Sequence, residues 1–246
     1  MSSASRVSMP SPEPGTRVFV LIPRRSLVVL AAAIALIGNP NARGASDWDL
    51  KISDTEAGIK VYYRTNQNGY TEFRAVTRVR SSLGAFVGLF RDVDNMPNWV
   101  YRTKKVQTLT IPGATEAYAY TISEMPWPLD DRDSIVRSTL SQDPATLAIT
   151  IYGSAVPDYL PRDSRYVRMP VVESFWRFTP VTEGLVEVEF QGYGDPGGNL
   201  SSGFLNWVVR VSLWEAPYQT LLGLQRAVPL PEYQSRTFDF VREPGR

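Results

Sequence analysis

The segment from Phe204 to Arg226 constrains the fold of this chain most. Its pattern predicts a long helix, yet its charged residues are only Arg210, Glu215 and Arg226. A helix on the surface of a soluble protein normally has an apolar stripe about 100° wide and a charged opposite face. This segment is apolar on almost every face. It must therefore meet a sheet, a second element, a membrane or a bound ligand on more than one side.

The N-terminus has the pattern of a secretory signal. Two arginines precede an apolar run over residues 26–38, which is shorter than the roughly 20 residues needed to span a bilayer. The run fits the apolar h-region of a signal peptide, and small residues just before Ala45 suit cleavage there. We therefore expect residues 1–44 to be removed and the mature protein to be periplasmic or secreted. The alternative is a protein anchored in the membrane through an uncleaved N-terminal segment.

Removal of that segment changes the charge balance. The chain has 26 basic and 25 acidic residues, and residues 1–44 hold five of the basic and one of the acidic ones. The mature net charge is then −3. Such a chain lacks the basic surface that binding to phosphate backbones requires, so we expect no nucleic-acid partner.

The chain contains no histidine and no cysteine. The missing histidine excludes Ser-His-Asp and Cys-His catalysis and histidine-ligated zinc. A domain of roughly 200 residues buries enough surface to fold without disulfides. The sequence therefore indicates no metal site and no cofactor, and carboxylates, Lys, Arg, Tyr, Ser and Thr remain for chemistry.

Alternating polar and apolar residues predict a long series of strands. In residues 70–80 the apolar side chains from Phe73 to Val79 take one face, and Arg74, Arg78 and Glu72 take the other, solvated face. This period of two is typical of a half-buried antiparallel strand. Further strands are predicted at residues 58–64, 106–111, 117–123, 133–141, 145–152, 171–178 and 185–193.

Helices are predicted at three places. A short one covers Asp47–Leu50, a second follows the capping serines at residues 81–82 and ends near Asp92, and the long apolar one closes the domain. We expect the tail over residues 229–246 to be extended, with two phenylalanines packing it back onto the body. Together these elements predict one α+β domain, in which a curved antiparallel sheet carries helices on one side.

Short motifs follow one another along nearly the whole mature chain. They are Trp48 before Gly58-Ile59-Lys60-Val61-Tyr62, Phe73-Arg74-Ala75, Asp92-Val93-Asp94 before Trp99, Pro126-Trp127-Pro128, Arg132-Asp133, Val167-Arg168, Trp176, Asp195-Pro196-Gly197-Gly198 and Leu205-Asn206-Trp207. In this order and spacing they resemble the START domain, the lipid-transfer domain of the helix-grip, Bet v 1-like superfamily. One departure is the loop 200–203, where family members often have a proline after the paired glycines.

The resemblance implies a helix-grip fold, in which the sheet wraps around the long C-terminal helix and an internal apolar tunnel holds one lipid. Residues 45–228 would form this domain. Pro217 favours a kink in the helix, which suits a gate over the tunnel; the alternative is simple core packing. The expected lipid contacts are Trp99, Trp127, Arg132, Trp176, Phe204, Trp207, Val208, Val211 and Tyr218.

Several of these contacts have a second interpretation. The three tryptophans outside the helix suit the protein core better than a ligand contact. Arg132 and Asp133 suit a structural salt bridge or loop clamp better than a ligand contact. If Arg132 points inward, it needs a carboxylate or a lipid headgroup as its partner.

The resulting hypothesis is a monomeric, non-enzymatic protein that carries one sterol-like or acyl lipid. A dozen buried methylenes contribute on the order of 10 kcal/mol, so exchange requires transient contact with a membrane surface. One alternative is an enzyme of the same superfamily, a cyclase, aromatase or hydrolase of hydrophobic substrates, with Glu124 or Asp133 as acid or base. Another is a ligand sensor. The residues do not select among sterol, phospholipid and fatty acid.

Overall fold

The computed structural model describes residues 48–198, 203 and 214–245. The expected signal segment 1–44 lies outside these residues. Four of the expected lipid contacts, Phe204, Trp207, Val208 and Val211, also lie outside them, so their predicted roles stay predictions.

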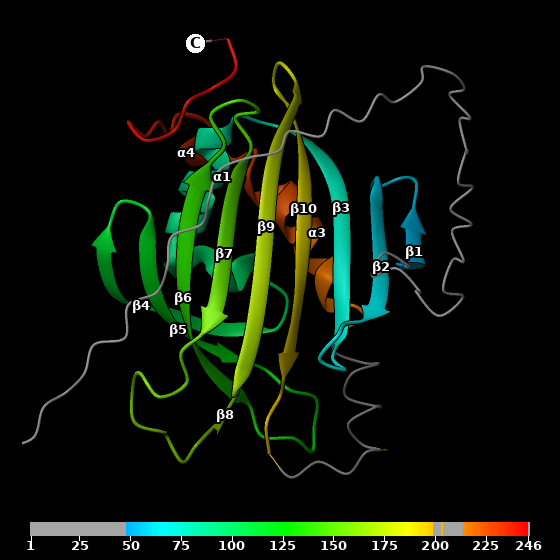
Figure 1. Cartoon of the computed structure of the whole chain (residues 1–246), viewed down its shortest axis with the longest axis vertical. Coiled ribbons are helices and arrows are strands. Elements are labelled where there is room, and N and C mark those ends of the chain that lie inside the picture. Colours follow the sequence, from blue (N-terminus) through cyan, green and yellow to red (C-terminus); the bar gives the residue numbers. More distant parts are fainter. Residues whose placement is uncertain (1–47, 199–202, 204–213, 246) are drawn as a thin grey trace, which may run out of the picture. The chain divides into compact units, whose positions relative to one another are not determined.

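One large antiparallel sheet dominates the described part of the chain (Figure 1). Its strands are β1 (Asp49–Asp54), β2 (Ile59–Thr65), β3 (Thr71–Arg80), β4 (Thr103–Gly113), β5 (Glu116–Ser123), β6 (Arg132–Gln142), β7 (Ile149–Ala155), β8 (Val167–Arg168), β9 (Val171–Thr182) and β10 (Leu185–Asp195). The order across the sheet is β1-β2-β3-β10-β9-β7-β6-β5-β4, and β8 pairs in parallel with β6 off this path. The curved sheet confirms the predicted α+β, helix-grip class.

Helices lie on one side of this sheet. They are α1 (Leu83–Arg91), the 3-10 helix η1 (Val93–Asn98), α3 (Ala216–Ala227) and the short α4 (Pro231–Gln234). Figure 1 shows α1 and α3 behind the strands, on the same side. None of the helices in the described residues is long and apolar enough to cross a membrane.

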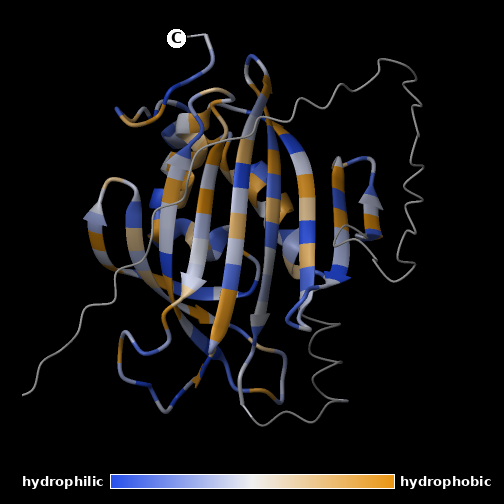
Figure 2. Ribbon diagram, viewed as in Figure 1, coloured by the Kyte–Doolittle hydropathy of each residue, from blue (hydrophilic) through white to orange (hydrophobic). Residues whose placement is uncertain are grey.

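The alternation along the strands explains why one face is covered. On β3 the side chains of Phe73, Ala75, Thr77 and Val79 are buried, and the arginines between them are not. Figure 2 shows the same alternation of hydrophobic and hydrophilic residues along the central strands. Apolar residues at every second position supply the inner face, and the helices cover it.

Helix α1 begins and ends as the sequence predicts. The Ser82 hydroxyl accepts a hydrogen bond from the Ala85 amide at 3.1 Å, which is an N-cap. The helix ends at Arg91, and seven of its nine residues are buried. Phe86 stacks on Phe178 of β9, with ring centroids 4.6 Å apart, and so fixes the helix on the sheet.

Two predictions about helices are wrong. Asp47–Leu50 does not open a helix, because residues from Asp49 form strand β1 and extend the sheet beside β2. Pro217 does not kink the interior of a helix. It lies in the first turn of α3, where a missing N–H breaks no helical hydrogen bond, and the two residues before Ala216 form a turn.

The C-terminal tail is packed onto the body rather than extended throughout. Tyr233 of α4 is buried, and its hydroxyl donates to the Asp92 carboxylate at 2.6 Å. Farther along, the Glu243 carboxylate accepts hydrogen bonds from the Leu83 and Gly84 amides at 3.1 and 2.7 Å. Phe238 and Phe240 pack against the core, as expected. The tail therefore supplies a second cap to the first turn of α1.

That cap predicts a measurable loss of stability. Replacing Glu243 with Ala leaves two amides at the start of α1 without an acceptor, and we expect the free energy of unfolding to fall by about 1–2 kcal/mol. Urea denaturation monitored by circular dichroism measures it. Asp239→Ala, a change at an exposed carboxylate of the same tail, is the control and should have little effect. Equal stability of the two variants would show that the tail does not cap the helix.

Candidate functional site

An apolar cavity lies between the helices and the inner face of strands β4 to β7. Its volume is about 150 Å³. Val87 and Phe90 of α1, Met96 of η1, and Ala119 and Ile151 of the sheet line it. An apolar cavity of about 150 Å³ accommodates benzene, whereas sites for larger ligands usually measure about 300–1,000 Å³. This cavity alone therefore holds part of a ligand, a ring or a short run of methylenes.

A cluster of aromatic rings fills the neighbouring part of the inner face. Trp176 of β9 stacks on Phe190 of β10 with centroids 3.8 Å apart, and Phe90 meets Trp176 edge-on at 5.0 Å. Trp99 joins the cluster at 5.2 Å from Phe90. Trp99 and Trp176 are only 4% and 7% exposed. They belong to the core, and Phe90 joins this core to the cavity wall.

Helix α3 closes over Trp99 through a close backbone contact. A Cβ atom on Gly223 would overlap the Trp99 carbonyl, so only glycine fits this position of the helix. The buried Trp99 indole N–H has no hydrogen-bond partner in the described residues. Tyr218 of the same helix points elsewhere: its hydroxyl donates to the Asp54 carboxylate at 2.6 Å. Tyr218 thus ties α3 to the end of β1.

Small side chains continue the inner face away from the aromatic cluster. Strand β6 pairs in unbroken register with β5 and β7. Its alternate residues Ser134, Val136 and Ser138 therefore share the face of the cavity-lining Leu140. Beside them lies Gly153, where a Cβ would come 2.6 Å from the Ser174 hydroxyl. The face is thus lined with small residues along β6.

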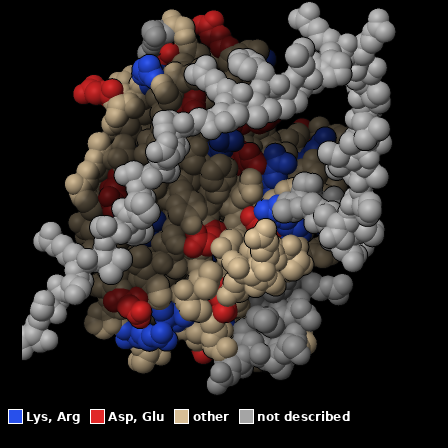
Figure 3. All heavy atoms as spheres, viewed as in Figure 1, with Lys and Arg blue, Asp and Glu red and all other residues tan. Residues whose placement is uncertain are grey.

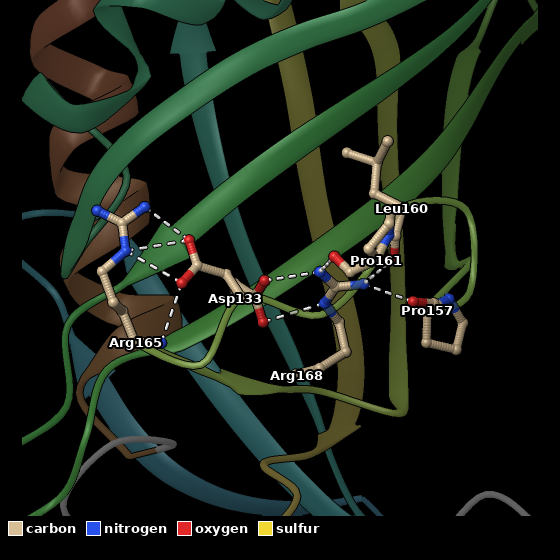
Figure 4. Close-up of polar contacts among 7 residues, drawn as sticks. Asp133, Pro157, Leu160, Pro161, Arg165 and Arg168 are labelled. Carbon is tan, nitrogen blue, oxygen red and sulfur yellow. Dashed lines mark hydrogen bonds and ion pairs between the residues drawn. The ribbon is translucent and has the colours of Figure 1, made fainter.

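The outer face at the same end of the sheet carries a buried ion pair. Asp133 and Arg168 have side chains only 1% exposed, and they form two hydrogen bonds of 3.0 and 2.8 Å. Figure 4 shows the guanidinium of Arg168 between this carboxylate and the carbonyls of Pro157, Leu160 and Pro161. Because both charges have partners, the pair can be buried. It fastens the loop between β7 and β8 to strand β6.

Arg132, the neighbour of Asp133, points to the inner face. It is 2% exposed, and its Nε donates to the Pro196 carbonyl at 3.0 Å while its Nη1 donates to the Asp130 carbonyl. No carboxylate of the described residues lies within 4.0 Å of it, and its Nη2 has no hydrogen-bond partner there. Burial lowers the pKa of this guanidinium from its usual value, yet an arginine remains charged in proteins. Arg132 therefore clamps two loops, and the nearby Asp130 and Asp131 carboxylates stabilise its charge without a direct ion pair.

The acidic loop beside Arg132 is itself held by hydrogen bonds. The Asp131 carboxylate accepts hydrogen bonds from Lys104 at 2.7 Å and from the Met125 amide at 3.2 Å. The Lys104 hydrogen bond is the main reason why the pKa of Asp131 lies below its usual value. This carboxylate is thus paired with Lys104, and it also interacts favourably with the charge of Arg132. No group of three potential metal ligands occurs in the described ranges.

Trp127 lies on the surface instead of in the cavity. It belongs to the loop between β5 and β6, next to a cis Trp127–Pro128 bond, and it is 89% exposed. The other exposed rings on the described surface include Trp214 and Tyr159. A fully exposed tryptophan suits contact with a membrane interface better than contact with a lipid inside the protein.

The outer face of the central strands is a solvated charged face, as the sequence predicts. Arg74 pairs with Glu189 at 2.5 Å and Arg78 with Glu187 at 2.9 Å. Figure 3 shows basic and acidic side chains side by side on this view of the molecule. Pairs of both signs cancel one another, so this face offers no strong field to a charged partner.

Sequence reasoning missed two parts of the site. Arg168 was identified only as part of a motif. It lies 35 residues after Asp133, and the sequence does not show that the two side chains meet. The cavity wall was also missed. The helical spacing of Val87 and Phe90 indicates only a buried stripe, and the cavity depends on the small residues opposite them.

Comparison with known proteins gives consistent matches. The model of the START domain family matches residues 39–228. An uncharacterised protein of Pseudomonas aeruginosa is 30% identical over 204 residues, which cover 82% of this chain and 96% of that protein. The crystal structure of a STAR-related lipid transfer protein fragment from Xanthomonas axonopodis is 30% identical, with a TM-score of 0.66 over 74% of this chain and 99% of that chain. Human STARD10, at 17% identity and a TM-score of 0.63 over 76% and 75% of the two chains, shares the fold.

The buried ion pair predicts a strong asymmetry between single and double variants. Asp133→Ala leaves the Arg168 charge buried without a partner, and we expect a loss of about 3–5 kcal/mol in the free energy of unfolding. Asp133→Leu combined with Arg168→Met should lose much less, because no charge remains buried. Urea denaturation measures the free energy of unfolding of each variant. The control is Glu187→Ala, which breaks an exposed ion pair, and we expect it to lower the free energy of unfolding by less than about 1 kcal/mol. Equal losses in the single and double variants would contradict the pairing.

Proposed function

We propose that this chain, which belongs to the START domain family, binds one hydrophobic lipid, sterol-like or acyl, and exchanges it at membrane surfaces. The observation that carries the proposal is the apolar cavity between α1, η1 and the sheet. It continues into a face of small residues along β6. A soluble fold normally fills such a face with large side chains, so its small residues suit a ligand that supplies the missing apolar volume.

The same geometry favours a carrier over an enzyme. Asp133 is the buried carboxylate among the described residues, and both of its oxygens accept hydrogen bonds from Arg168. A carboxylate held in this way is a poor general acid or base, because its proton would have to displace a buried ion pair. The cavity wall itself is mostly apolar and presents one carboxylate, that of Glu116, which pairs with Arg137. We therefore propose binding and transfer without turnover.

Membrane contact is the second element of the proposal. Trp127 is exposed on the β5–β6 loop, and this loop is tied to Arg132 through the Asp130 carbonyl. Tryptophan prefers the interface between water and lipid, so the loop is a suitable docking point at the end of the sheet. The expected gate, the segment from Phe204, begins after the loop that Arg132 holds through Pro196. We propose that docking releases this gate.

Export is the third element. We propose that the protein works outside the cytoplasm, as a periplasmic or secreted monomer, because residues 26–38 have the length and composition of a signal h-region. Cell fractionation followed by mass spectrometry of the N-terminus tests this. Recovery of the full-length chain from the cytoplasm alone would contradict it.

Lipid binding should depend on the free volume of the cavity. Ala119→Trp places an indole in the cavity, and we expect co-purified lipid, measured by native mass spectrometry, to fall from about one per protein to well below one. The fold should persist, because the introduced ring fills existing space. The matched control is Ala145→Trp in an exposed turn, which should leave lipid content unchanged. The proposal would be contradicted if the Ala119 variant retained the wild-type amount of lipid, or if the wild-type protein converted an added substrate into a product.

Transfer between membranes should depend on Trp127. Trp127→Ala removes the exposed indole without touching the cavity, so we expect the transfer rate between vesicles to fall several-fold while the bound-lipid content stays the same. A fluorescent lipid transferred between donor and acceptor vesicles measures the rate, and Trp127→Phe should retain part of it.

In the same assay Val208→Asp tests the gate. Wild-type rates in both variants would refute docking and gating at this end of the domain.

A further inference from the structure

Strand β5 has a cavity on each of its faces. Ala119 lines the inner cavity described above, and Tyr120 lines a second groove on the outer face. This groove has a volume of about 400 Å³ and lies between β4, β5 and the loop over residues 156–166 that joins β7 to β8. Successive side chains of a strand point to opposite faces, so the sheet itself separates the two cavities. The volume of the outer groove lies within the range of about 300–1,000 Å³ that is usual for small-molecule sites.

The loop that forms one wall of the outer groove is fixed in place. The buried guanidinium of Arg168 donates hydrogen bonds to three carbonyls of this loop (Figure 4). Tyr159 of the loop also stacks on Tyr118 of β5, with ring centroids 4.9 Å apart. The groove is therefore preformed by contacts within the protein, and a ligand that enters it does not have to order the loop first.

Flat and apolar side chains form much of the wall. The rings of Tyr120 and Tyr166 line the groove together with Leu160 and Pro161 of the loop. Ile122, two residues after Tyr120 on the same face of β5, also lines it and is only 9% exposed. Aromatic rings bind other flat rings by offset or edge-on stacking. Such a wall suits a planar aromatic ligand better than a flexible chain.

Lys105 gives the groove a net positive charge. Arg165 pairs with Asp163 through hydrogen bonds of 2.6 to 3.1 Å, and Arg168 pairs with Asp133. The charges within each of these two pairs cancel. The Lys105 side chain extends from β4 into the groove, is exposed, and forms no ion pair with a carboxylate of the described ranges. One positive charge therefore remains at the rim of an aromatic wall.

We propose that this outer groove binds a small aromatic carboxylate, with the ring of the ligand against Tyr120 and Tyr166 and its carboxylate at Lys105. Gln107 lies two residues from Lys105 on the same face of β4, about 7 Å along the strand, and its amide adds an N–H donor for the carboxylate. The site is separate from the lipid cavity, which lies on the other face of β5, and it does not depend on the proposed lipid-binding function.

The full-length wild-type protein tests the proposal directly. The probes are 2-naphthoate, its neutral amide and acetate, each titrated into the protein and followed by two-dimensional NMR. We expect the naphthoate to bind about 5-fold more tightly than the amide, because only the carboxylate gains from the charge of Lys105. Acetate should bind much more weakly, because it lacks the ring. The backbone amides that shift should include those of the loop 156–166, which lines only the outer groove.

Three variants locate the ligand. Lys105→Met should remove the preference for the naphthoate over the amide, and Tyr166→Ala should weaken the binding of both several-fold. Ala119→Trp fills the inner cavity from the opposite face of β5, so it should leave the binding of the naphthoate unchanged. Lys60→Met, at an exposed lysine of β2, is the control for the loss of a positive charge and should change nothing.

Four outcomes would overturn the outer site. They are no binding of the naphthoate by the wild type, equal binding of the naphthoate and the amide, an unchanged preference in the Lys105 variant, and loss of binding in the Ala119 variant, which would place the ligand in the inner cavity. The proposed lipid-binding function is tested separately by the content of co-purified lipid. Lys105→Met and Tyr166→Ala should leave that content unchanged, so the two proposals can fail independently.

Discussion

The fold at the β8 end of the sheet depends on how β6 divides two adjacent charged residues between its faces. The alternation of a strand sends Asp133 outward, where Arg168 neutralises it, and sends Arg132 inward. The outward pair fastens β8 and the long loop before it to the sheet. The inward arginine holds the loops at Asp130 and Pro196. A shift of register by one residue would exchange the two roles and bury Asp133 on the inner face without Arg168, so this register is specified strongly.

The cavity exists because large and small residues are distributed unevenly over the inner face. Rings from Trp99, Trp176 and Phe190 fill one part of it at close-packed distances. Along β6 and at Gly153, the side chains of this face are small. Protein interiors are normally close-packed, and a face of small side chains makes fewer contacts of its own. Under the proposed function, a hydrocarbon chain lying there would supply such contacts.

The architecture could be predicted from the sequence wherever alternation was regular. Strands β3 and β10 and helix α1 follow period-two or helical patterns, so their predicted and observed positions agree closely. The prediction failed at Asp47–Leu50, where strand pairing with β2 decides the structure over four residues too few to show a period. It also failed at Pro217, because proline suits both a kink and a first turn, and only tertiary contacts select one. The ion-pair partner of Asp133 depends on topology, which residue spacing does not reveal.

Helix α1 connects the tail to the cavity. Its buried side contributes Val87 and Phe90 to the cavity wall, and its first turn is capped by Glu243. A Cβ on Gly84 would overlap the Arg236 carbonyl, so the tail lies directly against the helix backbone. The wall of the cavity is therefore held by a segment that contributes no lining residue to it. The sheet end near Arg132 has its own clamps, which do not involve α1. Because the two ends are fixed by separate contacts, a change in the loops at Arg132 can proceed without loosening the apolar cavity at the other end.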